Sequence, residues 1–93
     1  MSQGIYLLCE TTGQAVHVSE ASSSWFRGAD SSLVVGAFCE AHFGQQLTVI
    51  GEDWTFDQYT EWTPKNVEQQ FALIAPGKHA YLAGIRDALN QTA

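Results

Sequence analysis

The N-terminal residues alternate between apolar and polar side chains in two short runs. Residues 5–9 (Ile-Tyr-Leu-Leu-Cys) and 15–19 (Ala-Val-His-Val-Ser) flank the segment Thr-Thr-Gly-Gln. Two such runs around a glycine-containing turn predict a β-hairpin, with Gly13 in the turn. The period of two places one set of side chains on one face, Ile5, Leu7, Cys9, Val16 and Val18, and a second set on the other, Tyr6, Leu8, Glu10 and His17.

A serine-rich stretch follows the hairpin. Residues 19–32 contain six serines and Gly28. This composition predicts a loop, with one helical turn around Trp25 and Phe26. Two adjacent aromatic rings in so polar a segment are either tucked under another element or displayed to solvent.

Helical spacing begins at residue 32. In residues 32–43, apolar side chains recur at i, i+3, i+4 and i+7, as Val34, Ala37, Phe38 and Ala41. This stripe predicts an amphipathic helix, with Asp30 or Ser31 as its N-cap. Gly44 suits the left-handed position that follows a helix. Residues 46–50 (Gln-Leu-Thr-Val-Ile) then predict a strand.

The pattern after Gly51 is ambiguous. Trp54 and Phe56 alternate as in a strand, whereas Tyr59 and Trp62 are spaced as in a helix. The Thr63-Pro64 pair is typical of a helix start. Residues 64–75 then fit either a helix, from the spacing of Val67, Phe71 and Ile74, or a short buried strand over residues 71–75.

The C-terminal residues predict a second amphipathic helix, after the Pro-Gly break at residues 76–77. Its apolar positions are Tyr81, Leu82, Ile85 and Leu89, and we expect it to fray after Asn90. The sum is one domain over residues 1–93 of the α+β class. We expect a three-stranded antiparallel sheet, formed by the N-terminal hairpin and one further strand, with two or three helices packed on one face.

Charge divides the chain into two unequal parts. Eight acidic residues and one arginine give residues 1–64 a sum of −7, while three basic and two acidic residues give residues 65–93 a sum of +1. The net charge of −6 argues against direct binding to nucleic acid or to anionic lipid. No apolar run approaches the roughly 20 residues that span a bilayer, and no signal peptide is visible at the N-terminus, so we expect a cytoplasmic protein that does not bind membranes.

The negative charge is densest in residues 52–62. This segment holds four acids and four aromatics without a basic residue. Aromatic rings supply buried contact area in interfaces, and surrounding carboxylates attract a basic partner. The alternative is a solvated acidic face without a partner. We predict a partner-binding surface, with Trp54 and Phe56 in the core if the segment extends the sheet and with Tyr59 and Trp62 at the rim or surface. Its predicted residues are Glu52, Asp53, Asp57, Tyr59, Glu61 and Trp62.

Metal binding and catalysis receive little support. Cys9, His17, Cys39 and His42 are zinc-ligand types, but they form no Cys-x-x-Cys motif, and strand alternation places Cys9 and His17 on opposite faces. No nucleophile motif or phosphate-binding glycine loop is present. We predict no metal, no cofactor and no catalytic residue, with both cysteines as free thiols.

Three functions remain open. The first is a small acidic inhibitor that docks on a basic protein surface, either an immunity or antitoxin-like protein that plugs the cleft of a nuclease or toxin, or a phage anti-defence inhibitor. The second is a structural or regulatory homodimeric subunit that pairs through an edge strand or through the C-terminal helix. The third is a small-ligand binder or enzyme, which requires a concave pocket with convergent polar groups.

Overall fold

An antiparallel hairpin forms the centre of the sheet. The computed structural model describes residues 3–28, 31–52 and 58–91. Strand β1 (Gln3–Cys9) pairs with β2 (Gln14–Ala21), and the Gly13 N–H donates to the Cys9 carbonyl at 2.9 Å. Gly13 has a φ of 68°, a left-handed conformation that glycine adopts at little steric cost. The predicted hairpin is confirmed.

The two faces of the hairpin carry different environments, as the alternation predicts. Cys9 and Val16 belong to the buried apolar core, and Leu7 and Val18 pack against it. On the opposite face, the rings of Tyr6 and His17 meet edge to face, with their centroids 5.3 Å apart.

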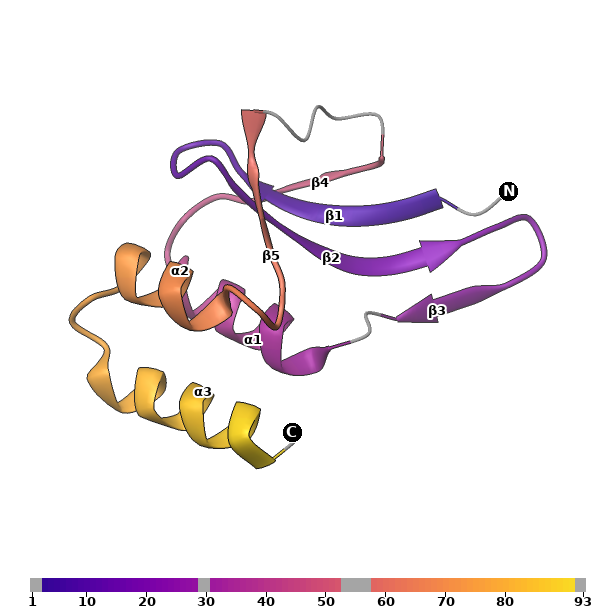
Figure 1. Ribbon diagram of the computed structural model, residues 1–93. Coiled ribbons are helices and arrows are strands. Elements are labelled where there is room, and N and C mark those ends of the chain that lie inside the picture. Colours follow the sequence, from indigo (N-terminus) through magenta and orange to yellow (C-terminus); the bar gives the residue numbers. More distant parts are fainter. Residues whose placement is uncertain (1–2, 29–30, 53–57, 92–93) are drawn as a thin grey trace.

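The sheet has five strands, so the predicted three-stranded sheet is too small (Figure 1). Strand β4 (Thr48–Ile50) pairs antiparallel with β1 and confirms the strand expected within residues 46–50. Strand β3 (Phe26–Gly28) pairs antiparallel with the end of β2, where the prediction of a loop with a helical turn is wrong. Strand β5 (Thr60–Trp62) pairs parallel with the start of β2.

The two unpredicted strands share one edge of β2. Strand β2 pairs with β1 along one edge. Along its other edge, the first residues of β2 pair with β5 and the last residues of β2 pair with β3. Each of the two strands has only three residues, and all three residues of β3 are exposed. A strand this short, with no buried face, leaves no periodic signal in the sequence.

Three helices complete the fold. Helix α1 (Ser32–Ala41) buries Val34, Ala37 and Phe38 and is capped by the Ser31 hydroxyl, which accepts from the Val34 N–H at 3.3 Å, so the predicted helix is confirmed. Residues 64–75 were predicted as either a helix or a short strand, and the structure has helix α2 (Val67–Ile74) there. It begins three residues after Pro64, at the end of a turn over residues 63–66.

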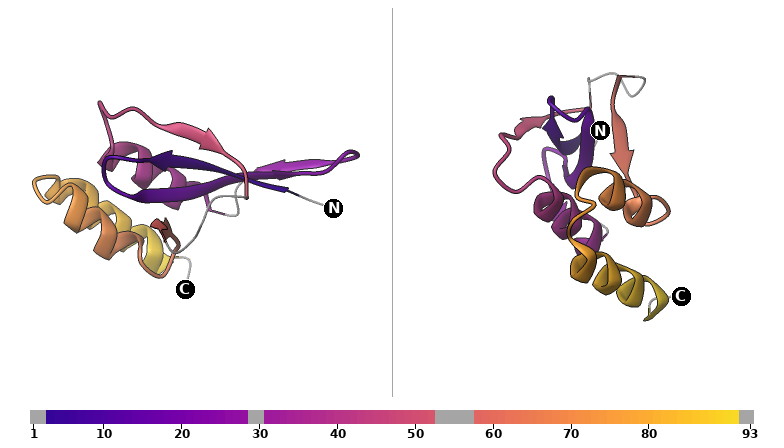
Figure 2. Two further views of the ribbon diagram at one scale, coloured as in Figure 1. Left: turned by 90° about the horizontal axis from the view of Figure 1, so that it is seen from above. Right: turned by 90° about the vertical axis from the view of Figure 1, so that its left-hand side faces the viewer.

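The helices lie on one side of the sheet in two tiers. Helix α1 packs against β2, whereas α3 (His79–Gln91) packs mainly against α1 and α2 and lies furthest from the sheet (Figure 2). Lys78, just before α3, ties the two tiers together, since its Nζ donates to the carbonyl of Glu40 at 2.7 Å and to the carboxylate of Glu40 at 3.1 Å.

The core lies between the sheet and the helices. Phe38, Trp62 and Phe71 are its largest members, and each is at most 2% exposed. The Trp62 ring stands edge to face against Phe38 at 5.2 Å, and the Trp62 Nε1–H donates to Gln14 Oε1 at 2.5 Å. β5 therefore contributes the indole that closes the core against β2.

Candidate functional site

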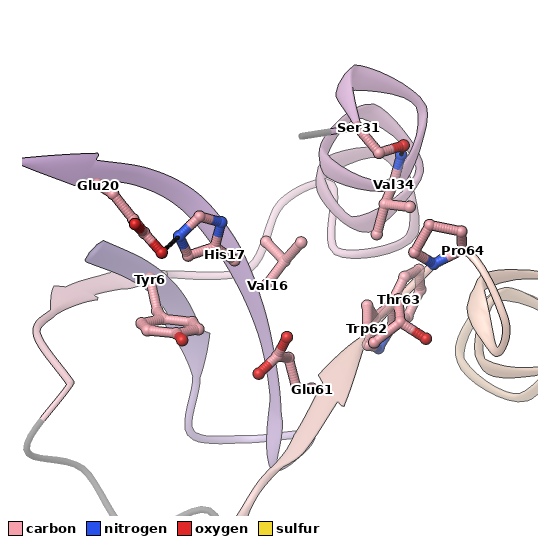
Figure 3. Close-up of a pocket in the computed structure, with 10 residues that line it drawn as sticks. All are labelled: Tyr6, Val16, His17, Glu20, Ser31, Val34, Glu61, Trp62, Thr63 and Pro64. Carbon is pink, nitrogen blue, oxygen red and sulfur yellow. Dashed lines mark hydrogen bonds and ion pairs between the residues drawn. The ribbon is translucent and has the colours of Figure 1, made fainter. Parts of the chain in front are cut away.

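A pocket of about 270 Å³ opens beside the shared edge of β2 (Figure 3). β5 occupies this edge over residues 14–16 and β3 over residues 19–21, so neither strand pairs with residues 17–18. A bulge lies at the same place, because Ile5 faces Ser19 while Tyr6 faces His17. Bulges redirect side chains at functional sites, and here the bulge accompanies an opening in the ladder.

The pocket has a polar side and an apolar side. The titratable groups are Tyr6, His17, Glu20 and Glu61. The apolar wall is formed by Val16, Val34, Trp62 and Pro64, and the hydroxyl residues Ser31 and Thr63 complete the lining. Four different elements supply the polar groups and the wall: β1, β2, β5 and α1. The site therefore exists only in the folded protein.

Three carboxylates direct negative charge onto Tyr6. Burial, the largest cause, raises the pKa of the Tyr6 phenol above its ordinary value of 10.0, and the charges of Glu61, Glu52 and Glu20 raise it further. Glu52, which follows β4, is held by the Gly4 N–H, which donates to its Oε1 at 2.6 Å. Charge from three separate segments is thus concentrated at one ring.

Two side chains lie beside the Glu20 carboxylate, and one of them is a permanent cation. Its Oε2 lies 3.3 Å from Arg27 Nη2, and its Oε1 lies 3.5 Å from His17 Nε2. The geometry of the second contact is not that of a hydrogen bond, and within the described part of the chain the buried His17 Nε2 has no hydrogen-bond partner. A group that enters the pocket can therefore find a polar atom that is not otherwise satisfied.

Glu61 is the distinctive group of the site. Its half-buried side chain points into the pocket between Tyr6 and the α1 side (Figure 3). Among residues 3–28, 31–52 and 58–91, no cation or hydrogen-bond donor binds its carboxylate. Within the described part of the chain, the Glu61 carboxylate is therefore open to pairing with a cation that enters the pocket.

The predicted partner-binding residues are divided by the structure. Glu52 and Glu61 both act on Tyr6, and Tyr59 is half-buried just before β5. Asp53 and Asp57 lie outside the described residues, as do Trp54 and Phe56, whose burial was predicted.

The prediction that Trp62 lies at the rim or surface is wrong. Trp62 is 2% exposed, because strand alternation in β5 directs Glu61 to the pocket and turns the next side chain into the core. The helical spacing of Tyr59 and Trp62 gave a misleading signal, since residues 60–62 form a strand.

Sequence reasoning missed three members of the site, namely Tyr6, His17 and Glu20. The alternation of β1 and β2 did place Tyr6 and His17 together on the face opposite Cys9 and Val16. Nothing in the sequence placed that face beside residue 61, because the parallel pairing of β5 with β2 joins segments more than 40 residues apart.

Other candidate chemistry is not assembled in the described residues. Cys9 is buried and Cys39 is exposed, both as free thiols. Within residues 3–28, 31–52 and 58–91, no three side chains of the His, Cys, Asp and Glu types are grouped so as to hold a metal ion. In the same ranges, no helix has the length and apolar character needed to cross a bilayer.

Aromatic side chains are displayed away from the pocket. Trp25 and Phe26, at the turn between β2 and β3, are 45% and 72% exposed. Of the two alternatives for these rings, burial under another element or display to solvent, the structure shows display to solvent. The hairpin of β2 and β3 projects from the body of the protein (Figure 2).

Comparison of the chain with protein-family models, with curated protein sequences and with solved structures finds no match.

Proposed function

We propose that this protein is a binding protein, without catalysis, that docks on a basic protein surface and receives a lysine or arginine side chain of its partner in the pocket. The single observation that supports this most strongly is the Glu61 carboxylate, which faces the pocket with no cation bound to it in the described residues. A guanidinium or ammonium group placed there would form an ion pair with Glu61, and the negative charges of Glu20 and Glu52 would attract it further.

The remaining groups of the pocket suit a cationic side chain. The Tyr6 ring lies beside the carboxylates, and a cation over the face of an aromatic ring, within about 6 Å of its centroid, is stabilised by roughly 0.5–2 kcal/mol. The apolar wall of Val34 and Pro64 can accommodate the methylene stem of lysine or arginine.

Electrostatic attraction extends beyond the pocket. Residues 1–64 sum to −7, and all three carboxylates that act on Tyr6 belong to this part of the chain. A field of one sign steers an oppositely charged partner and raises its association rate. This charge layout fits an inhibitor of the immunity or antitoxin type, which covers the positively charged cleft of a nuclease or toxin, and it fits an anti-defence inhibitor equally well.

A second candidate, a small-ligand binder, is favoured by the concave pocket with its convergent polar groups. The volume of about 270 Å³ lies just below the roughly 300–1,000 Å³ typical of drug-sized ligands. This size suits one side chain or one small organic cation, so we place the docking function first.

A homodimeric subunit is the remaining alternative. Of the C-terminal apolar residues, Tyr81 is 53% exposed, Leu82 and Leu89 are partly buried, and Ile85 is 5% exposed. Light scattering at several concentrations distinguishes the cases, since the docking function requires no self-association.

The test of the docking function uses affinity capture from the native cell with three immobilised proteins: wild type, E61Q and E10Q. Glu10 is an exposed acid in the hairpin turn with no ion pair among the described residues, so E10Q removes the same charge away from the pocket. Proteins retained at about 50 mM salt and released at about 500 mM are identified, and the best candidate is purified.

Binding of the purified partner then decides the matter. We expect a basic partner whose dissociation constant rises at least tenfold, about 1.4 kcal/mol, with E61Q and changes little with E10Q. Equal binding by both variants would show that the pocket is not the docking site, and salt-independent binding would show that charge does not drive association.

A further inference from the structure

A second histidine, His42, is enclosed in the core directly behind β5. It follows α1 and is 2% exposed. Its Nδ1 lies 2.8 Å from the Phe38 carbonyl oxygen and its Nε2 lies 2.8 Å from the Thr12 hydroxyl oxygen. Its ring lies 4.2 Å from the Phe38 ring and 5.8 Å from the Trp62 ring, centroid to centroid. One imidazole thus joins the hairpin turn, α1 and β5.

The hydrogen bonds of His42 fix the tautomer of its neutral ring. A carbonyl oxygen can only accept, so Nδ1 carries the hydrogen and donates to Phe38. Nε2 then has a lone pair and accepts from the Thr12 hydroxyl. A protonated ring keeps both contacts if the Thr12 hydroxyl turns to accept from Nε2–H, so the cost of a charge on His42 comes from its burial and not from a lost hydrogen bond.

No carboxylate of the described residues lies close enough to His42 to pair with a positive charge on its ring. The groups packed against it are the Thr12 hydroxyl from the turn, Phe38 from α1 and Trp62 from β5. The nearest acids along these elements are turned elsewhere: Glu10 is exposed, Glu40 binds Lys78 and Glu61 faces the pocket. Of the histidines, only His17 has a carboxylate oxygen of the described residues within 4.0 Å of a ring nitrogen. Burial lowers the pKa of His42 from 6.5, by more than its hydrogen bond to Phe38 raises it.

The position of β5 depends on this neutral core. β5 has three residues and is held by its register with residues 14–16 and by the insertion of Trp62 beside Phe38 and His42. Glu61, the preceding residue, reaches the pocket because Trp62 is seated in this way. A charge on His42 makes the closed arrangement costly, and moving Trp62 outward admits water to the imidazole.

We infer that His42 is an acid-sensitive latch for the pocket: its protonation releases β5 and withdraws Glu61 from the site. The consequence for docking rests on the function proposed above, whereas the opening of β5 does not. Because the latch takes up a single proton, the equilibrium for opening increases by at most about tenfold for each pH unit below 6.5, down to the pKa of the closed state.

The experiment follows hydrogen exchange by NMR from pH 7.5 to pH 5.0 in the wild-type protein. The reporters are the Trp62 indole N–H, which is bonded to Gln14, and the backbone amides of β5, α1, α2 and α3. We expect the protection factors of the Trp62 indole and of β5 to fall with pH, after correction for the intrinsic exchange rate, while the amides of α2 and α3 stay protected. Constant protection of Trp62 overturns the inference, and so does a simultaneous loss of protection throughout the chain, since that is global unfolding.

Two variants identify the proton. H42Q keeps hydrogen-bonding atoms without a titrating ring, and we expect it to remove the pH dependence of Trp62 protection. H79Q removes an exposed histidine of α3 and should leave the dependence unchanged. If H42Q does not fold, H42F, which keeps an aromatic ring at this position, takes its place. An unchanged pH dependence in the folded His42 variant contradicts the latch.

The E61Q variant separates the latch from the docking function. We expect E61Q to keep the acid-induced opening of β5 while it loses affinity for N-acetylarginine amide, the probe of the pocket. Opening without any binding of the probe by wild type would refute the docking function alone. Binding of the probe without opening would refute the latch alone.

Discussion

The substitution Trp62→Phe tests the placement of β5 most sharply. Trp62 is 2% exposed, and its indole N–H donates to Gln14 Oε1. Gln14 is itself only 8% exposed. Phenylalanine keeps an aromatic ring but removes the donor, which leaves a buried amide oxygen without its partner at a cost of about 1–3 kcal/mol. The smaller ring leaves a void beside Phe38, so we expect a total loss of about 2–4 kcal/mol in the free energy of unfolding.

This magnitude distinguishes a buried Trp62 from an exposed one. A surface substitution away from specific contacts changes stability by about 0.5 kcal/mol or less. Urea denaturation followed by far-ultraviolet circular dichroism measures the difference, and a loss of 2 kcal/mol corresponds to a midpoint shift of about 1–2 M. A midpoint within the error of the wild-type value would refute the burial of Trp62 against Gln14.

A double-mutant cycle isolates the hydrogen bond from the loss of ring volume. In Q14L the indole donor is left unpaired, whereas in W62F/Q14L both polar groups are gone. We expect the double variant to lose less stability than the sum of the two single variants, by about 1 kcal/mol or more, because neither buried partner is then left unsatisfied. Additive losses would contradict the bond.

Three further predictions concern separate contacts. Burial lowers the pKa of His42 from 6.5 in the folded state, so the unfolded chain binds more protons below pH 6.5. The contribution of neutral His42 to stability is therefore complete above pH 6.5 and is lost as the pH falls toward the folded pKa. Denaturant titrations should show a loss of at most about 1.4 kcal/mol per pH unit. E61Q should lower the raised pKa of the Tyr6 phenol toward 10.0. An ultraviolet absorbance titration measures this pKa, and the Y6F variant identifies the Tyr6 signal. An unchanged value would show that the Glu61 charge does not reach the ring. S31A should cost about 1 kcal/mol in thermal unfolding because the Val34 N–H loses its cap, and an unaltered midpoint would contradict that bond.

Local patterns predicted the elements that are long and amphipathic. The alternation of β1 and β2 has the period of a strand, and the repeat of Val34, Ala37 and Phe38 has the period of a helix, so both could be recognised without knowledge of the rest of the chain. The C-terminal helix was predictable for the same reason, although its apolar residues differ in exposure.

The short strands could not be predicted, because nothing local specifies them. β3 exposes all three of its residues, and its pairing with β2 leaves no apolar alternation. β5 is a parallel strand only because residues 14–16 offer a free edge to it. Its misassignment had a direct consequence, since the face of Trp62 depends on strand alternation rather than on helical spacing.

The candidate site was predicted only in part. Glu52 and Glu61 stood out because acids and aromatics are concentrated around them, and both act on Tyr6. Tyr6, His17 and Glu20 carry no such signal, because each is an ordinary strand residue until β5 is placed beside them. Pockets formed by distant segments are set by tertiary pairing, which composition and periodicity do not encode.

The most direct measurement of the central claim is a chemical-shift titration of the isotope-labelled protein with N-acetylarginine amide at low salt. We expect the largest changes on residues around the pocket, namely Tyr6, His17, Glu20 and Glu61, and we expect E61Q to abolish them and E10Q to preserve them. Changes spread evenly over the acidic surface, or equal changes in E61Q and wild type, would contradict a pocket that receives a cationic side chain.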